Sequence, residues 1–337
     1  LSQLVVAKYS TMKISSRKAV LLAATACAVL FSLNTLWASD MPEIVRFLTT
    51  ENGDVANEET ARALQALSPV IVTLVTSVTD INELCHTFKS LKNVRGNENA
   101  PIIAFFMDEV NAAQETILKG CTDRNVFFDS IDLETYPVGF VPDPSKDYRQ
   151  GHINRFWTTG IWLKDVLGPY DIVMRVDDDS CFSSVLPNVP GFSKINQVYS
   201  SQYFPGDIDL NVRRLTGMYE FVVNYIEQNN LIPFYNMLWT HVITTEEATG
   251  SIPNFQDSFE VSRKSFMQSP EVSAFHYNLT DMPPYGYYTQ GWNVDAERFL
   301  TAAIFGTKAS IDIITLDGFV QKDLQRGRVH PRICHFE

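Results

Sequence analysis

The sequence YDIVMRVDDDSCF at Tyr170–Phe182 decides the fold class, because an apolar strand in it runs directly into three consecutive aspartates. The run Ile172–Val176, broken only by Arg175, is typical of a strand that is covered on both faces. In an open α/β sheet, ligands bind in the crevice at the carboxyl ends of the strands. Carboxylate oxygens at that place suit hard cations such as Mn²⁺ or Mg²⁺, which can neutralise a diphosphate. The alternative is a solvated acidic turn after a core strand.

Asp177 and Asp179 form an Asp-x-Asp pair, the usual device by which nucleotide-sugar glycosyltransferases hold a metal. We expect Asp177 to bind the metal, and Asp179 to bind the metal or the ribose of a donor. Asp178 would point to the opposite side if the strand geometry continued through it.

Strand and helix patterns alternate ahead of this stretch, which favours a mainly parallel central sheet flanked by helices. The sequence therefore predicts an α/β fold with a single catalytic domain from residue 67 onward. Expected strands cover residues 69–78, 101–107, 126–131 and 310–316, and expected helices cover 82–91, 108–118, 154–167, 210–229 and 295–305.

The overall composition excludes one class of partner. The chain has 337 residues, 45% of them hydrophobic, so it can bury a substantial core. Its formal net charge is −12, which argues against a nucleic-acid partner, since binding to a phosphate backbone needs a basic face. Any pyrophosphate site must therefore be built locally from a metal and a few basic side chains.

The apolar segment 19–38 is long enough for a membrane span. Lys13, Arg17 and Lys18 precede it and acidic residues follow it, so the positive-inside rule predicts a cytosolic amino terminus. We expect a cytosolic tail at 1–18, a type II signal anchor at 19–38, a stem at 39–66 and a lumenal domain at 67–337. A cleaved signal peptide is the alternative.

Both alternatives place the domain in the secretory pathway. Asn278 then lies in a usable N-glycosylation sequon, Asn278-Leu279-Thr280. Four cysteines would lie in an oxidising compartment, which allows one or two disulfides with all pairings open: Cys85, Cys121, Cys181 and Cys334.

Four blocks of the chain carry a family resemblance when taken in order. The first joins Arg155-Phe156 and Gly160 to the strand at 170–182; the second is a short element at 199–201. The third, NFQDSFEVSRKSFMQS at 254–269, is similar to a Trp-Ser-Asn-Phe-Glu-Ile-Gly segment. The fourth, PYGYYTQGWNVDAERFLTAAIF at 284–305, is similar to a Gly-Phe-Phe-Tyr-Glu-Arg-Trp-Gly-Asp-Ala-Pro-Val-His block. Together they resemble glycosyltransferase family 15, the fungal α-1,2-mannosyltransferases of the Golgi.

The resemblance implies a GT-A-like nucleotide-sugar-binding fold and a retaining, metal-dependent transferase. Such an enzyme moves mannose from GDP-mannose to the 2-hydroxyl of a mannosyl acceptor in protein glycosylation. The chain departs from the family at Asp177-Asp178, where the family has Glu-Pro, and it has no clear copy of the His-x-Ile-Gly-Tyr element that supplies a metal-binding histidine. His330 is the best candidate for that ligand, and His335 is the next.

The resemblance also assigns catalytic roles to two carboxylates. Glu260 matches the Phe-Glu-Ile-Gly glutamate and would act as nucleophile or stabilise oxocarbenium character. Its alternative is a capping glutamate at a helix start. Asp295 matches an aspartate near the acceptor hydroxyl or the donor sugar, with a helix N-cap as the alternative.

The remaining candidates would contact the donor. Arg155 and Arg175 could bind phosphate, or form structural ion pairs; Arg175 could also pair with Asp177. Tyr288 and Trp292 could stack on a sugar, although clustered aromatic residues are more often part of a core.

Two further functions remain open on the sequence. The change from Glu-Pro to Asp-Asp would suit a transferase of the same fold that uses a UDP-sugar. The missing histidine element would suit a catalytically silent lumenal protein that binds glycans.

Overall fold

The computed structural model describes residues 69–75, 81–94, 99–107, 110–132, 134–178, 180–182, 197–200, 212–213, 215–314 and 319–321, all within the compact unit Ala63–Glu337. The predicted tail, anchor and stem, together with Asp179, His330 and His335, lie outside these residues. Within the described ranges, no helix is long and apolar enough to span a membrane.

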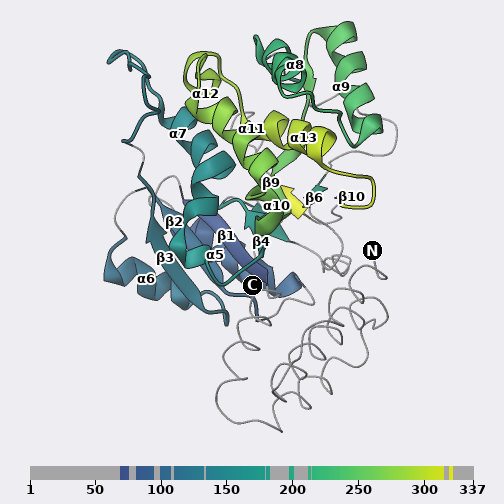
Figure 1. Cartoon of the computed structure of the whole chain (residues 1–337). Helices are drawn as coiled ribbons and strands as arrows, with labels where there is room; N and C mark the ends of the chain where they lie inside the picture. Colours follow the sequence, from purple (N-terminus) through teal and green to yellow (C-terminus); the bar gives the residue numbers. More distant parts are fainter. Residues whose placement is uncertain are drawn as a thin grey trace, which may run out of the picture. The chain divides into compact units, whose positions relative to one another are not determined.

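A seven-stranded sheet forms the centre of the described fold (Figure 1), in the order β10-β6-β9-β4-β1-β2-β3. The strands β4, β1, β2 and β3 are parallel, β10 is parallel to β6, and β9 runs antiparallel to both of its neighbours. This arrangement confirms the predicted mainly parallel α/β sheet. The strands are β1 Pro69–Val75, β2 Ile102–Phe106, β3 Val126–Ser130, β4 Ile172–Val176, β6 Gln197–Ser200, β9 Gln256–Arg263 and β10 Ile311–Ile314.

Two short antiparallel pairs and the helices complete the described elements. The pairs are β5 Ser180–Phe182 with β11 Phe319–Gln321, and β7 Val212–Arg213 with β8 Ile252–Pro253. The helices are α5 Ile81–Ser90, α6 Ala112–Lys119, α7 Arg149–Arg155, α8 Met218–Gln228, α9 Asn236–Thr249, α10 Lys264–Met267, α11 Pro270–Asp281, α12 Gly286–Thr289 and α13 Val294–Phe305. The helix expected at 154–167 instead starts at Arg149 and passes into a π turn, Phe156–Gly160, and short 3₁₀ turns.

The two faces of the sheet are covered by different elements because successive strand residues point to opposite sides. In β1, Ile71 and Val75 pack with α5 and α6, whereas Val70 and Val72 pack with the segment that carries Trp157. Burial on both faces explains why the strands read as nearly continuous apolar runs.

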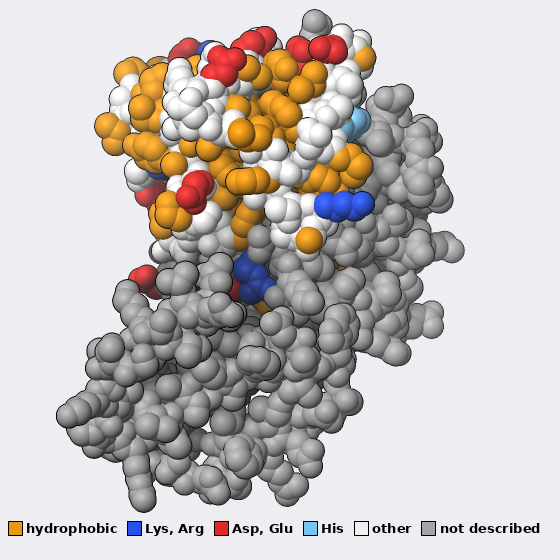
Figure 2. Space-filling view, turned by 45° about the vertical axis from the view of Figure 1, so that its right-hand side comes forward, with side chains coloured by type: hydrophobic (Ala, Val, Ile, Leu, Met, Phe, Trp, Pro, Cys, Tyr) orange, Lys and Arg blue, Asp and Glu red, His pale blue; other side chains and the backbone are white. Residues whose placement is uncertain are grey.

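A third apolar cluster joins the helices α8, α9, α11, α12 and α13. Figure 1 shows α11, α12 and α13 above β9, with α8 and α9 at the upper right. The connection between α8 and α9 exposes Ile232 and Phe234, and the first turn of α9 exposes Met237. In Figure 2 apolar side chains gather on this upper part, with acidic side chains among them.

β9 is a central strand, so the alternative for Glu260 as a capping residue at a helix start is wrong. Glu260 lies opposite Arg175 of β4 and Tyr199 of β6 in the register. Its strand neighbours Phe259 and Val261 are both buried. The pairing with strands on both sides, which involves residues distant in sequence, fixes this conformation.

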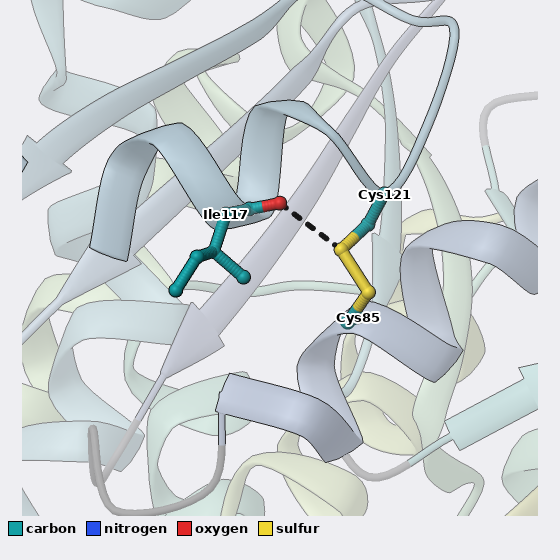
Figure 3. Close-up of a disulfide and its surroundings, with 3 residues drawn as sticks. All are labelled: Cys85, Ile117 and Cys121. Atoms are coloured by element: carbon teal, nitrogen blue, oxygen red, sulfur yellow. Dashed lines mark hydrogen bonds between the residues drawn. A yellow bond between two sulfur atoms is a disulfide. The ribbon is translucent and has the colours of Figure 1, made fainter. Parts of the chain in front are cut away.

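A disulfide links Cys85 of α5 to Cys121, just beyond α6, with Cα atoms 5.3 Å apart. Figure 3 shows the bridge beside Ile117, whose carbonyl oxygen lies 3.1 Å from the Cys121 sulfur. A disulfide sulfur carries no proton, so this approach is a contact and not a conventional hydrogen bond. Cys181 is also disulfide-bonded. The Cys85–Cys121 disulfide settles one of the pairings that the sequence leaves open.

Gly286 is required by close packing at the start of α12. A Cβ atom at this position would lie 2.0 Å from Cδ2 of the buried Trp292. We expect Gly286→Ala to lower the free energy of unfolding by about 1–3 kcal/mol, because the core must shift to admit the methyl group. Urea denaturation measures this loss. As a control, Gly160→Ala meets its nearest neighbour at 3.4 Å and should be neutral or stabilising. Equal urea midpoints for Gly286→Ala and the wild type would contradict this packing.

Candidate functional site

Asp177 lies at the carboxyl end of β4, as the sequence predicts. Its carboxylate accepts a hydrogen bond from Arg175 Nε over 3.1 Å. Arg175 is buried, and its guanidinium lies 4.2 Å from the centroid of the Trp157 ring. Arg175 therefore pairs with Asp177, one of the roles expected for it.

Asp177 is chemically suited to bind a divalent metal. Its side chain is 20% exposed, and carboxylate oxygens are ligands that Mn²⁺ and Mg²⁺ accept. In the part of the chain that the structure describes, no three His, Cys, Asp or Glu side chains gather into a metal-binding group. The two other predicted ligands, Asp179 and His330, are outside the described ranges. The suitability of this site for a divalent metal thus rests on the Asp177 carboxylate and its position at the end of β4.

Glu260 is held by a buried arginine from α13. Arg298 donates from Nε to Glu260 Oε2 over 2.8 Å and from Nη2 to Oε1 over 3.2 Å. Glu260 is 3% exposed and Arg298 is 2% exposed. A two-point ion pair of this kind fixes the plane and direction of the carboxylate.

The same arginine also donates to Glu297 and to the Trp157 backbone. Its Nη1 donates to Glu297 Oε2 over 2.7 Å, and its Nη2 donates to the Trp157 carbonyl over 2.7 Å. Trp157 therefore contacts Arg298 through its backbone and Arg175 through its ring. A continuous set of contacts joins the Glu260 carboxylate to the β4 arginine that holds Asp177.

Glu297 extends this buried network from Arg298 to His276 of α11. Its Oε1 lies 2.7 Å from His276 Nε2 and accepts a 2.7 Å hydrogen bond from the Thr301 hydroxyl. Burial alone would raise the pKa of Glu297, but Arg298 and His276, with the hydrogen bonds, lower it to about 2. Glu297 is therefore ionised, and it shares the Arg298 charge with Glu260.

The depressed pKa of Glu297 predicts an acid-dependent loss of stability. The ordinary value is 4.5, so the contribution is fully present above it and is lost as the pH falls towards 2. The difference in unfolding free energy between wild type and Glu297→Gln should be large at about pH 6 and shrink towards about pH 3. Urea titrations at a series of pH values measure it. A difference in unfolding free energy that does not change with pH would show that ionisation of Glu297 does not contribute to stability.

Asp295 lies in the first turn of α13 and is buried. The N-cap of that helix is Asn293, whose side chain accepts the Ala296 N–H, so the alternative for Asp295 as the cap is wrong. The helix starts one residue earlier than expected, because an asparagine at that position is as good a cap as aspartate. The Asp295 carbonyl accepts the Phe255 N–H over 3.3 Å, which ties α13 to the chain ahead of β9. Its role near a substrate stays a prediction.

The other donor-site candidates have structural partners. Arg155 of α7 forms an ion pair with Asp281 at the end of α11, with its Nε 3.1 Å from Oδ1. Trp292 is 1% exposed, and its indole N–H donates to the Thr216 carbonyl. These contacts match the alternatives expected from the sequence, which are an ion pair for Arg155 and a core position for Trp292. The roles of both residues towards a donor stay predictions.

Tyr288 belongs to a cluster of aromatic rings that packs between α7 and α12. Its hydroxyl lies 3.3 Å from Nδ1 of the buried His152. Burial raises the pKa of Tyr288, so the phenol keeps its proton. Other members of the cluster are Tyr136, Phe140, Tyr148 and Tyr285.

Asn278 is half-buried on α11, where its side-chain amide donates to the Ala274 carbonyl over 2.8 Å. Thr280 of the same sequon is buried. Glycosylation of Asn278 stays a prediction.

One cavity beside the aromatic cluster was not predicted from the sequence. Its volume is about 310 Å³, and its lining residues come from the end of β2, the following loops and the start of α7. They are Met107, Tyr136, Lys146, Asp147, Tyr148, Arg149 and His152. The signal was the run KDYR at 146–149, with two bases, one acid and one aromatic ring directly after a proline-rich loop.

Comparisons with known proteins agree with the predicted fold. No protein-family profile and no curated protein matches the sequence. Among solved structures, core-mannan synthase A (CmsA/Ktr4) from Aspergillus fumigatus in its Mn/GDP form matches with a TM-score of 0.61 and 14% identity, over 75% of this chain and 74% of that chain. The mannosyltransferase Ktr4p from S. cerevisiae matches with a TM-score of 0.61 and 16% identity, over 92% of this chain and 82% of that one. Its complex with GDP matches with a TM-score of 0.60 and 16% identity, over the same shares. The resemblance expected from the sequence is thus confirmed at the level of the fold, which this chain shares with solved mannosyltransferases.

Proposed function

We propose that the protein is a metal-dependent glycosyltransferase that takes mannose from GDP-mannose. One observation carries the proposal. Asp177 at the end of β4 and Glu260 on the adjacent strand β9 lie in a fold shared with mannosyltransferases that were solved with GDP, one of them in a Mn/GDP form. The sheet edge beside Asp177 is where an α/β fold binds a nucleotide.

In this proposal Asp177 holds Mn²⁺ or Mg²⁺, and Arg175 orients the Asp177 carboxylate. The metal, when bound, supplies Lewis-acid charge neutralisation at the diphosphate leaving group. Glu260 lies one strand away, and two hydrogen bonds from Arg298 fix the direction of its carboxylate. A fixed negative charge on that side of the donor would stabilise positive charge that develops at the sugar.

The family resemblance supplies the finer part of the proposal. The acceptor is then a mannose residue of a glycan, the linkage is α-1,2, and the configuration of the donor sugar is retained. The protein would act in the Golgi lumen, held by a type II anchor at 19–38.

Binding of the donor nucleotide tests the proposal. In a thermal-shift assay on the full chain, GDP with Mn²⁺ should raise the melting temperature, since a ligand selective for the folded state stabilises it. EDTA should remove the shift, and UDP should give a smaller one. A larger shift with UDP would favour the UDP-sugar transferase that the Asp177-Asp178 departure suggests. A GDP shift that EDTA leaves intact would contradict the metal site.

A second candidate is a glycan-binding protein without turnover. The observation in its favour is that Glu260 is 3% exposed and that both of its carboxylate oxygens accept hydrogen bonds from Arg298. This candidate predicts binding of mannosides with no transfer from any nucleotide sugar. Product formation that Glu260→Gln abolishes would exclude it.

A further inference from the structure

The buried cluster behind β9 contains two carboxylates that share one guanidinium. Arg298 donates to Glu260 through Nε and Nη2, and to Glu297 through Nη1. All three side chains belong to residues that are at most 3% exposed, so little water screens the interactions between them. The Glu260–Arg298 ion pair is neutral as a unit, and Glu297 therefore adds a negative charge to it.

Several further groups hold the Glu297 carboxylate in place. The Thr301 hydroxyl donates to Oε1 over 2.7 Å, and His276 Nε2 lies 2.7 Å from the same oxygen. The Thr158 hydroxyl lies 3.4 Å from Oε2 and 2.7 Å from the Tyr287 hydroxyl. Burial raises the pKa of Tyr287, so the phenol keeps its proton and can donate to Thr158, which leaves the Thr158 proton for Glu297. Donors on both oxygens favour the charged form of a carboxylate.

Glu297 has the position of a residue that acts through another. Its side chain is 0% exposed, and Arg298 lies between it and Glu260. Arg298 takes one acceptor position on each oxygen of Glu260, and a carboxylate oxygen has two, so Glu260 can still face a sugar. The Glu297-Arg298 pair is also a departure from the block that this chain resembles, which has Pro-Val after the Asp-Ala matched by Asp295-Ala296.

We propose that Glu297 is a positioning residue of the transferase, whose buried charge leaves the cluster with one more carboxylate than arginine behind the donor sugar. The inference rests on the proposed function and adds to it a residue that does not touch the substrate. In the transfer, the bond between the anomeric carbon and the diphosphate oxygen breaks, and GDP leaves with the electron pair. The acceptor hydroxyl bonds to that carbon and gives its proton to the departing diphosphate. Positive charge that develops on the sugar is stabilised by fixed negative charge nearby, and the neutral ion pair alone would supply less of it.

The substitution Glu297→Gln tests this role, because it removes the charge and keeps an oxygen that can accept from Arg298 Nη1. The cluster becomes one charge more positive, whether His276 is neutral or protonated. In assays of the full chain with Mn²⁺, GDP-mannose and α-methyl mannoside, we expect kcat to fall by about 10- to 100-fold. KM for GDP-mannose should stay within about threefold of the wild-type value, because the lost interaction acts on the transition state.

Glu297→Asp separates charge from structure, since it shortens the side chain and keeps the charge. Its kcat should stay within about threefold of the wild-type value. Urea midpoints establish that each variant is folded under the assay conditions. If Glu297→Gln does not fold, Glu297→Asp carries the test alone, and a loss of kcat of about tenfold or more in folded Glu297→Asp would overturn the inference.

Asp171→Asn is a matched control, with the same change from carboxylate to amide beside an arginine. Asp171 accepts from Nη1 of Arg263, the last residue of β9, over 2.8 Å. This variant should transfer mannose as the wild type does. Equal kcat for Glu297→Gln and wild type would overturn the role of the Glu297 charge and leave the proposed function standing. A folded wild-type chain that transfers no mannose would overturn the proposed function itself, and this inference with it.

Discussion

Replacement of Arg298 by methionine is expected to lower the free energy of unfolding by about 3–5 kcal/mol. The side chain is almost fully buried between two carboxylates, those of Glu260 and Glu297. Its removal leaves both carboxylates buried without their shared cation, and an uncompensated buried charge is far more costly than the pair is stabilising. Urea denaturation measures the loss.

Two further variants separate charge from packing. Arg298→Met combined with Glu297→Gln should recover part of the lost stability, because one of the two stranded charges is gone. The exposed pair Lys119–Glu115 is the control, and Lys119→Met should cost less than about 1 kcal/mol. A loss for Arg298→Met as small as that of Lys119→Met would mean that the buried network does not hold β9 and α13 together.

Asp177→Asn is expected to reduce Mn²⁺-dependent GDP binding and mannose transfer by at least about 100-fold, since even residues that only support metal ligands cost 10- to 100-fold when changed. The amide can still accept the hydrogen bond from Arg175 Nε, so the fold should be kept. Calorimetry with GDP and Mn²⁺ measures the binding, and urea midpoints check the fold.

Asp129→Asn serves as the comparison for that variant. Asp129 lies near the carboxyl end of β3 and pairs with Lys164, away from the proposed site. It should bind GDP as the wild type does. If Asp177→Asn retained wild-type affinity in the presence of Mn²⁺, Asp177 would not be a metal ligand.

Local sequence was sufficient to predict the parallel half of the sheet. The apolar runs of β1, β2 and β4 are buried on both faces, and such strands are recognisable without knowledge of their partners. The position of Asp177 followed from the same reasoning, because the end of an apolar run is a local property.

β9 could not be recognised in the same way. Its conformation depends on pairing with β4 and β6, which come from distant parts of the chain. For the same reason the contact between Arg298 and Glu260 could not be predicted, since the two residues are 38 positions apart in the chain. The cavity was missed because its lining joins the end of β2 to the start of α7, and only the fold brings them together.

Product formation is the most direct test of the proposed function. The full chain is incubated with Mn²⁺, α-methyl mannoside and either GDP-mannose or a UDP-sugar, and the products are analysed by mass spectrometry. We expect a mannosyl-mannoside from GDP-mannose, none after addition of EDTA, and none from Asp177→Asn. A folded wild-type protein that binds mannosides but forms no product with any donor would contradict the account.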